Sequence, residues 1–117
     1  MQVTRIYTGV DGESHIEDVT VPLRDLGEIG KLSELIPATG FVMRETGPDY
    51  DYDWHNAPRR QYVIMLSGSG VEIETGDGTR RVLGPGDILL AEDTTGRGHR
   101  SRATGPEPRV SLFVTLD

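Results

Sequence analysis

Apolar and polar residues alternate in short stretches along most of the chain, and this pattern predicts an all-β protein. The clearest unit comprises residues 61–67, 71–75 and 80–83, which two glycine-containing turns separate. The second turn contains Asp77-Gly78, and Asp-Gly between alternating strands favours a hairpin because glycine adopts positive φ without strain. Six further stretches have the same character: residues 3–8, 17–22, 41–46, 88–91, 100–103 and 109–116.

The alternation also assigns faces within two of these stretches. Glu72 and Glu74 alternate with apolar residues, which predicts a strand with one solvated face. Near the C-terminus, Ser111, Phe113 and Thr115 share one face of the predicted strand, and valines and leucines occupy the other. Each strand should therefore present one face to an interior and one to the outside.

Only residues 30–36, which Pro37 ends, are a candidate for a helix, and one helical turn or an irregular arm would fit them equally well. Many short strands with turns every ~8–12 residues are typical of a β-sandwich or barrel. No repeat, linker or low-complexity stretch interrupts the pattern. We therefore expect one domain over residues 1–117, with an N-terminal arm and strands in 1–40 and a barrel in 41–117.

The composition excludes several kinds of site. A chain of 117 residues can bury a core, and the absence of cysteine rules out disulfides, thiolate zinc sites and cysteine nucleophiles. No apolar leader opens the sequence, and its longest apolar run, residues 62–66, is far shorter than the ~20 residues of a membrane helix. A net charge of −7 without a basic stripe makes nucleic acid a poor partner. We expect a cytoplasmic protein with neither a membrane nor a nucleic-acid partner.

A spaced set of residues runs from His55 to Gly68. Gln61 follows His55 by six positions, and Gly68 follows Gln61 by seven. The first motif of the cupin superfamily is a His-x-His pair, a Glu three or four residues later and a Gly seven residues beyond it, and this stretch resembles that motif without a gap. Two ligand positions differ, because Ala57 stands where the second His would be and Gln61 where the Glu would be.

A later stretch resembles the second cupin motif more loosely. Gly86-Asp87 opens an apolar strand, a longer loop replaces the proline turn, His99 falls in the histidine place, and Ala103 stands where an Asn would be. The resemblance covers residues 40–117 and implies a small antiparallel β-barrel or double-stranded β-helix, also called a jelly roll. It further implies a homodimer, with residues 1–40 available for strand exchange or as a lid.

Cupins with all their ligands hold iron, manganese, nickel or zinc through three His and a Glu. The resemblance leaves His55, His99 and Gln61 as metal-ligating candidates here, and a neutral amide cannot balance a dication as a carboxylate does. Three acids could complete the set, although nothing in the spacing requires it: Glu45, Glu92 and Asp93. We expect either no metal or a weakly bound divalent ion of iron, manganese, nickel or zinc.

The resemblance implies a lumen that Gln61 faces, and strand alternation would then turn Val63 and Met65 inward as well, with His99 and Ser101 likewise sharing an inward face. The predicted catalytic residues are His55, His99 and Gln61, and the predicted lining residues are Ala57, Val63, Met65, Ser101 and Phe113. An imidazole in an apolar cavity can act as an acid or base near neutral pH, and a second His or a Gln can polarise a carbonyl. This predicts a small-molecule-binding cupin, metal-independent or weakly metal-dependent, that acts as an isomerase, lyase or cyclase on a small carbonyl compound.

Two other functions stay open, namely a metal-dependent cupin enzyme such as a dioxygenase and a non-catalytic dimeric cupin. The aromatic residues within 48–54 could stack on a planar ligand or form an edge-strand or dimer contact. Arg59 or Arg60 could clamp a carboxylate in the pocket or lie on the surface. We interpret the other clustered arginines as solvated strand edges: Arg80, Arg81, Arg97, Arg100 and Arg102.

Overall fold

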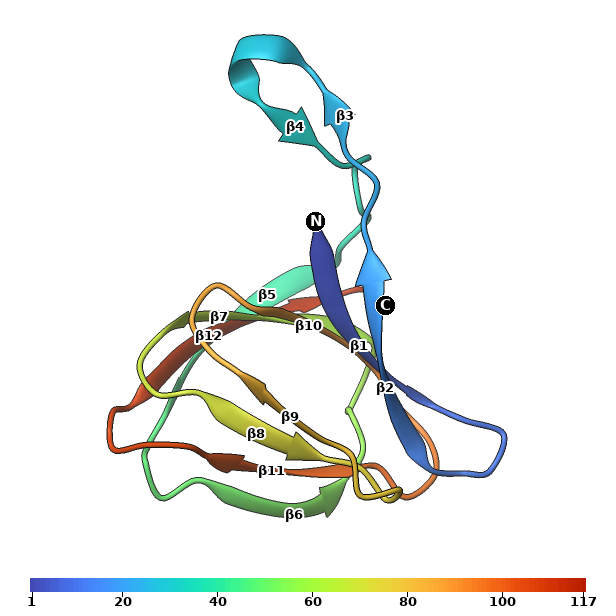
Figure 1. Ribbon diagram of the computed structural model, residues 1–117, viewed down its shortest axis with the longest axis vertical. Helices are drawn as coiled ribbons and strands as arrows, with labels where there is room; N and C mark the ends of the chain where they lie inside the picture. The colour runs from blue at the N-terminus through green and yellow to red at the C-terminus, as the bar shows by residue number, and fades with distance from the viewer.

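The computed structural model describes all of residues 1–117 as two facing β-sheets, with an arm that stands away from them (Figure 1). The six-stranded sheet has the order β2-β1-β10-β7-β12-β5. Its strands are β1 (Gln2–Thr8), β2 (Ser14–Thr20), β5 (Gly40–Thr46), β7 (Gln61–Ser67), β10 (Ile88–Glu92) and β12 (Arg109–Thr115). The four-stranded sheet, in the order β6-β11-β8-β9, contains β6 (Asp51–His55), β8 (Val71–Glu74), β9 (Arg80–Leu83) and β11 (His99–Ala103). The predicted all-β fold is confirmed.

The two sheets form a jelly-roll sandwich rather than a closed barrel. Neighbouring strands run antiparallel except β1 and β10, which are parallel. No strand ladder joins one sheet to the other, so side chains between them hold the sheets together. Ile6, Val63 and Leu89 of the six-stranded sheet belong to the same buried cluster as Val71 and Ile73 of the four-stranded sheet. Burial of each such side chain contributes ~1.5–3 kcal/mol.

Strand β12 turns its polar face inward. Ser111 is fully buried and Thr115 nearly so, whereas Leu112 and Val114 are only half-buried on the opposite face. Phe113 lies on the same face as Ser111, as the alternation predicts. The six-stranded sheet therefore has an interior that is polar along β12 and an outer face that is partly apolar.

The arm contains β3 (Arg24–Asp25), the short 3-10 turn η1 (Gly27–Ile29) and β4 (Lys31–Leu32). No helix forms over residues 30–36, so the helical alternative is wrong there and the irregular arm is correct. Gly30 has a φ of 97°, and no core lies beside the apolar side chains, since Leu35 is 92% exposed. Without a surface to pack against, such a short stretch gains too little to nucleate a helix. No helix in the structure is long and apolar enough to cross a membrane.

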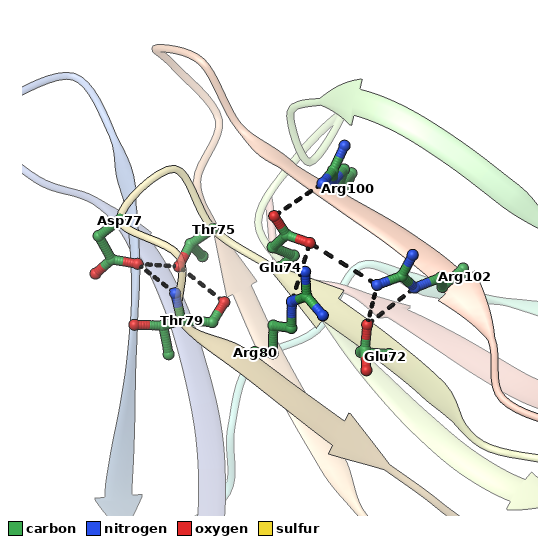
Figure 2. Close-up of polar contacts among 8 residues, drawn as sticks. All are labelled: Glu72, Glu74, Thr75, Asp77, Thr79, Arg80, Arg100 and Arg102. Carbon is green, nitrogen blue, oxygen red and sulfur yellow. Dashed lines mark hydrogen bonds and ion pairs between the residues drawn. The ribbon is translucent and has the colours of Figure 1, made fainter.

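The outer face of the four-stranded sheet is covered by ion pairs, as Figure 2 shows. Glu74 on β8 lies 2.9 Å from Arg100 on β11 and 3.3 Å from Arg80 on β9. Glu72 accepts a 2.9 Å hydrogen bond from Arg102. The predicted solvated face of this strand is therefore confirmed, and these arginines lie on the surface.

The turn between β8 and β9 is the hairpin that Asp77-Gly78 predicts. Gly78 has a φ of 86°, and its backbone N–H donates to the carbonyl of Thr75. The Asp77 carboxylate accepts hydrogen bonds of 2.6 Å from the Thr75 hydroxyl and 2.9 Å from the Thr79 backbone N–H (Figure 2). Chiefly because of the Thr75 bond, the pKa of Asp77 is lowered to about 2.

Candidate functional site

A cavity of about 330 Å³ lies between the two sheets, within the size range of small-molecule sites. Its wall includes every side chain that the sequence placed in the lumen: His55, Ala57, Gln61, Val63, Met65, His99, Ser101 and Phe113. The inward-facing positions of β7, β11 and β12 supply most of them, because alternate residues of a strand point to one face. The structure thus brings these residues together, while their catalytic roles stay predictions.

His55 ends β6 and lies opposite His99 in the strand register, with 4.5 Å between the two ring centroids. Its Nδ1 lies 2.7 Å from the carbonyl oxygen of Asp53. Because a carbonyl can only accept, Nδ1 carries the proton and Nε2 is left as an acceptor in the neutral ring. Burial lowers the pKa of His55 below its ordinary value, so this ring resists protonation.

His99 begins β11, and its ring is hydrogen-bonded to the carboxylate of Asp93, which lies outside the cavity wall. Its Nδ1 lies 2.5 Å from Oδ2 of Asp93, which is completely buried. The same Oδ2 accepts a 2.7 Å hydrogen bond from the fully buried hydroxyl of Ser14, on β2. The Asp93 carboxylate therefore fixes Nδ1–H as the donor and leaves Nε2 as the reactive nitrogen of His99.

Gly98 allows the two histidine strands to approach each other. A Cβ at this position would lie 2.0 Å from the carbonyl oxygen of His55, and the residue has a φ of 79°. Both the contact and the conformation require glycine. The loop before β11 is also fastened to the chain after β6, because the backbone N–H of Ala57 donates to the carbonyl of Asp93.

The donor set does not fit a tightly bound divalent metal. No group of three His, Cys, Asp or Glu side chains is placed to hold one. Asp93 lies behind His99 as its hydrogen-bond partner, Glu92 pairs with Arg5, and Glu45 is exposed, so none of the three acids completes the set. His55, His99 and the neutral amide of Gln61 are what the cavity offers.

Among the cavity residues that the sequence analysis did not predict, two are charged, namely Arg44 on β5 and Arg109 on β12. Arg109 shares its strand face with Ser111 and Phe113, so the alternation that assigned Ser111 to the inner face would also have assigned Arg109, two residues earlier. The two arginines that were considered do not enter the cavity. Arg60 pairs with Glu92 at the surface, and Arg59 is exposed.

Comparison with known proteins supports the fold and goes no further. No family model matches the chain. A crystal structure of protein NMB1881 from Neisseria meningitidis has a TM-score of 0.50 and 19% identity, over 72% of this chain and 81% of that one. A structure from Ralstonia eutropha, provisionally named a mannose-6-phosphate isomerase, is 24% identical over the whole chain and 85% of its own, with a TM-score of 0.42.

In sequence, the chain is similar to the β subunit of phenylalanine–tRNA ligase from Anaeromyxobacter dehalogenans, with 28% identity over 88 residues. That match covers 74% of this chain but 11% of the subunit. Because the matched part is so small a share of the subunit, the likeness assigns no activity to this chain.

Proposed function

We propose that the chain is a cupin-type enzyme that binds a small carbonyl compound in the cavity and removes a proton from the carbon next to the carbonyl, the first step of isomerase and lyase reactions of this kind. The contact between His99 and Asp93 is the observation that carries this proposal. A buried carboxylate 2.5 Å from Nδ1 fixes the tautomer and would stabilise the imidazolium formed at His99. Nε2 of His99 is then free to take up and return a proton.

The proposed step balances within the substrate. Nε2 of His99 removes a proton from the carbon next to the carbonyl, and the C–H electron pair becomes the C=C bond of an enolate. In an α-hydroxy carbonyl substrate, the hydroxyl proton then passes to the enolate oxygen. The imidazolium returns its proton to the former carbonyl carbon while the old hydroxyl oxygen forms the new C=O bond, which restores neutral His99. The amide N–H of Gln61, a residue only 6% exposed, can donate to the developing oxyanion without a charge of its own. Neutral His55 keeps the site from acquiring a second positive charge.

Proton exchange in heavy water tests this proposal across a range of candidate substrates. A panel of small aldoses, ketoses and oxo acids is incubated with the protein in D₂O, and the loss of protons next to the carbonyl is followed by NMR. We expect at least one compound to exchange faster than in buffer. His99→Asn should lower that rate by roughly 10²–10⁴-fold, the usual contribution of a general base, and Asp93→Asn should lower it as well.

His15 provides the matched control, because it also pairs with an aspartate, Asp11, at 3.0 Å, but lies on β2 outside the cavity. His15→Asn should leave exchange unchanged. Exchange by His99→Asn at the original rate, or no panel member exchanging faster than in buffer, would contradict the proposal.

A weakly bound divalent metal is a second candidate. Both imidazoles have Nδ1 tied to an acceptor, His55 to a carbonyl and His99 to a carboxylate, and such partners orient metal-ligating imidazoles. With Gln61 as the third donor, we expect metal added to the protein to be lost on dialysis. Stoichiometric iron, manganese, nickel or zinc that survives dialysis, and that His55→Ala and His99→Ala remove, would instead favour a metal enzyme.

A further inference from the structure

Two guanidinium groups face the cavity from neighbouring strands of the six-stranded sheet. Arg109 opens β12 and is only 6% exposed, and Arg44 on β5 is half-buried. The register pairs Arg44 with the inward-facing Ser111, so Arg44 also faces inward. Arg109 lies two positions before Ser111 on β12 and therefore shares the same face. Each guanidinium carbon lies 5.1 Å from the centroid of the same ring, that of Tyr50.

Neither arginine has an acidic partner. Seven other arginines lie within 4.0 Å of a carboxylate: Arg5, Arg60, Arg80, Arg81, Arg97, Arg100 and Arg102. Arg44 and Arg109 make no such pair, and none of the 18 residues that line the cavity is acidic. In a chain of net charge −7, this is a local excess of positive charge.

Burial of an unpaired guanidinium is unfavourable, and the surroundings only partly offset it. Burial and the nearby charge of Arg44 lower the pKa of Arg109, and the polar end of Tyr50 only partly opposes that shift. The cation–π contacts that both arginines make with the Tyr50 ring contribute only ~0.5–2 kcal/mol each. Three buried polar atoms at this end also lack a hydrogen-bond partner within the protein: Arg109 Nε, Thr46 Oγ1 and Ser111 Oγ. Thr46 and Ser111 stand directly opposite Arg109 and Arg44 in the register.

We propose that Arg109 and Arg44 bind a small oxyanion, a carboxylate or a phosphate, carried by the molecule that occupies the cavity. Guanidinium groups suit such groups because their N–H donors form a planar fork that matches two oxygens. Between the arginines and the histidines, the cavity wall is largely apolar, with Val63, Met65 and Phe113. This inference rests on the proposed function and narrows it: the substrate is a short carbonyl compound with an anionic end.

Matched pairs of ligands test the requirement for charge. One pair is 2-oxobutanoate and its methyl ester, and the other is dihydroxyacetone phosphate and dihydroxyacetone. NMR titration gives the Kd of each. We expect the anion of at least one pair to bind at least tenfold more tightly than its neutral partner, and the pair that shows the larger ratio identifies the oxyanion as carboxylate or phosphate.

Variants then assign the preference to these residues. Arg109→Gln and Arg44→Gln should each reduce the ratio at least fivefold, and Arg109→Lys should restore part of it, because lysine keeps the charge but not the fork. Arg59→Gln, at an exposed arginine outside the cavity, should leave the ratio unchanged. Arg44→Gln keeps the test decisive if Arg109→Gln fails to fold, because Arg44 is less buried.

The same titrations on His99→Asn separate this inference from the proposed function. A preference for anions that persists in His99→Asn, while no compound exchanges protons in the original protein, would uphold the oxyanion site and overturn the proton transfer. Equal Kd values for the anion and neutral partner of both pairs, or a preference that survives both glutamine substitutions, would overturn the oxyanion site whatever the exchange assay shows.

Discussion

His55 and His99 face each other across two paired strands, yet the groups behind them give the rings different chemistry. A backbone carbonyl holds Nδ1 of His55, whereas the buried carboxylate of Asp93 holds Nδ1 of His99. Only the carboxylate can stabilise a positive ring by a full charge. At the scale of single residues, we therefore assign proton transfer to His99 and expect His55 to stay neutral.

The neutral state of His55 makes stability depend on pH. Because burial holds the folded pKa of His55 below 6.5, the unfolded chain binds a proton more readily in mild acid. His55 therefore leaves stability unaffected above about pH 6.5 and lowers it as pH falls below that value toward the folded pKa. Urea denaturation should show a smaller loss of unfolding free energy between pH 7.5 and 5.5 for His55→Gln than for the original protein.

His15 gives a control of opposite sign. The hydrogen bond to Asp11 raises its pKa above 6.5, so its stabilising contribution is present below that value and is lost as pH rises through the folded pKa. The unfolding free energy of His15→Gln should therefore fall further below that of the original protein at pH 5.5 than at pH 7.5. The difference in unfolding free energy from the original protein should change with pH in opposite directions for His55→Gln and His15→Gln. If it changed in the same direction for both, the neutral state assigned to His55 would be wrong.

Gly98 decides how closely two strands approach, and its effect belongs to the scale of elements. A Cβ there meets the His55 carbonyl, whereas a Cβ at Gly78 meets nothing within 4 Å, although both glycines have positive φ, 79° and 86°. Gly78→Ala should cost ~1–2 kcal/mol of unfolding free energy from backbone strain alone. Gly98→Ala should cost a further ~1–3 kcal/mol because β6 and β11 must separate.

The exchange assay supplies the second readout for this pair. Gly98→Ala should reduce proton exchange because His55 and His99 move apart, and Gly78→Ala should leave it unchanged. Equal losses of stability in the two variants would show that the close approach of β6 and β11 is not constrained at Gly98.

Strands with a local signature could be predicted from the sequence. Strands β7, β8 and β9 have alternating residues and glycine turns, which specify a hairpin without reference to distant parts of the chain. Strand β6 was not predicted as a strand, although its aromatic stretch was interpreted as a possible edge contact. It lies at a sheet edge with Asp51, Tyr52 and Asp53 exposed, so no buried face marks it. Its pairing with β11 is set by the fold as a whole.

The residues of the candidate site likewise divide into those that the sequence could predict and those whose position depends on the fold as a whole. The resemblance to the two cupin motifs placed His55, Gln61 and His99 in one lumen, and alternation along the strands added the neighbouring lining residues. Arg44 and Arg109 were not predicted because arginine usually lies at the surface. Their burial depends on β5 pairing with β12, strands that are far apart in the sequence. Asp93 was considered only as a metal ligand, and its role behind His99 needs the folded loop.

At the scale of the whole molecule, much apolar surface lies outside the core. The arm exposes Ile29 by 71% and Leu35 by 92%, and the adjoining strand β5, a sheet edge, exposes Phe41 by 62% and Met43 by 75%. The base of the arm and the outer face of the six-stranded sheet also enclose an apolar groove that contains Ile64. An open strand edge beside such a surface invites pairing with another chain.

We expect a second copy of this chain to cover the arm and β5. Light scattering should give the dimer mass, and Leu35→Asp with Phe41→Asp should give the monomer mass. Val10→Asp is the control, because Val10 is fully exposed but lies in the turn between β1 and β2. A monomer mass for the original protein at a concentration well above the Kd of a stable homodimer would contradict this expectation.

The unpaired arginines also have a consequence for how fast an anion would reach them. An incoming anion first meets a molecule of net charge −7, and only then the two guanidinium groups. The repulsion acts through solvent and is screened over ~10 Å at 0.1 M salt, whereas contacts inside the cavity are screened much less. Added salt should therefore speed association while the lifetime of the complex changes little, the reverse of what a protein with a basic surface shows.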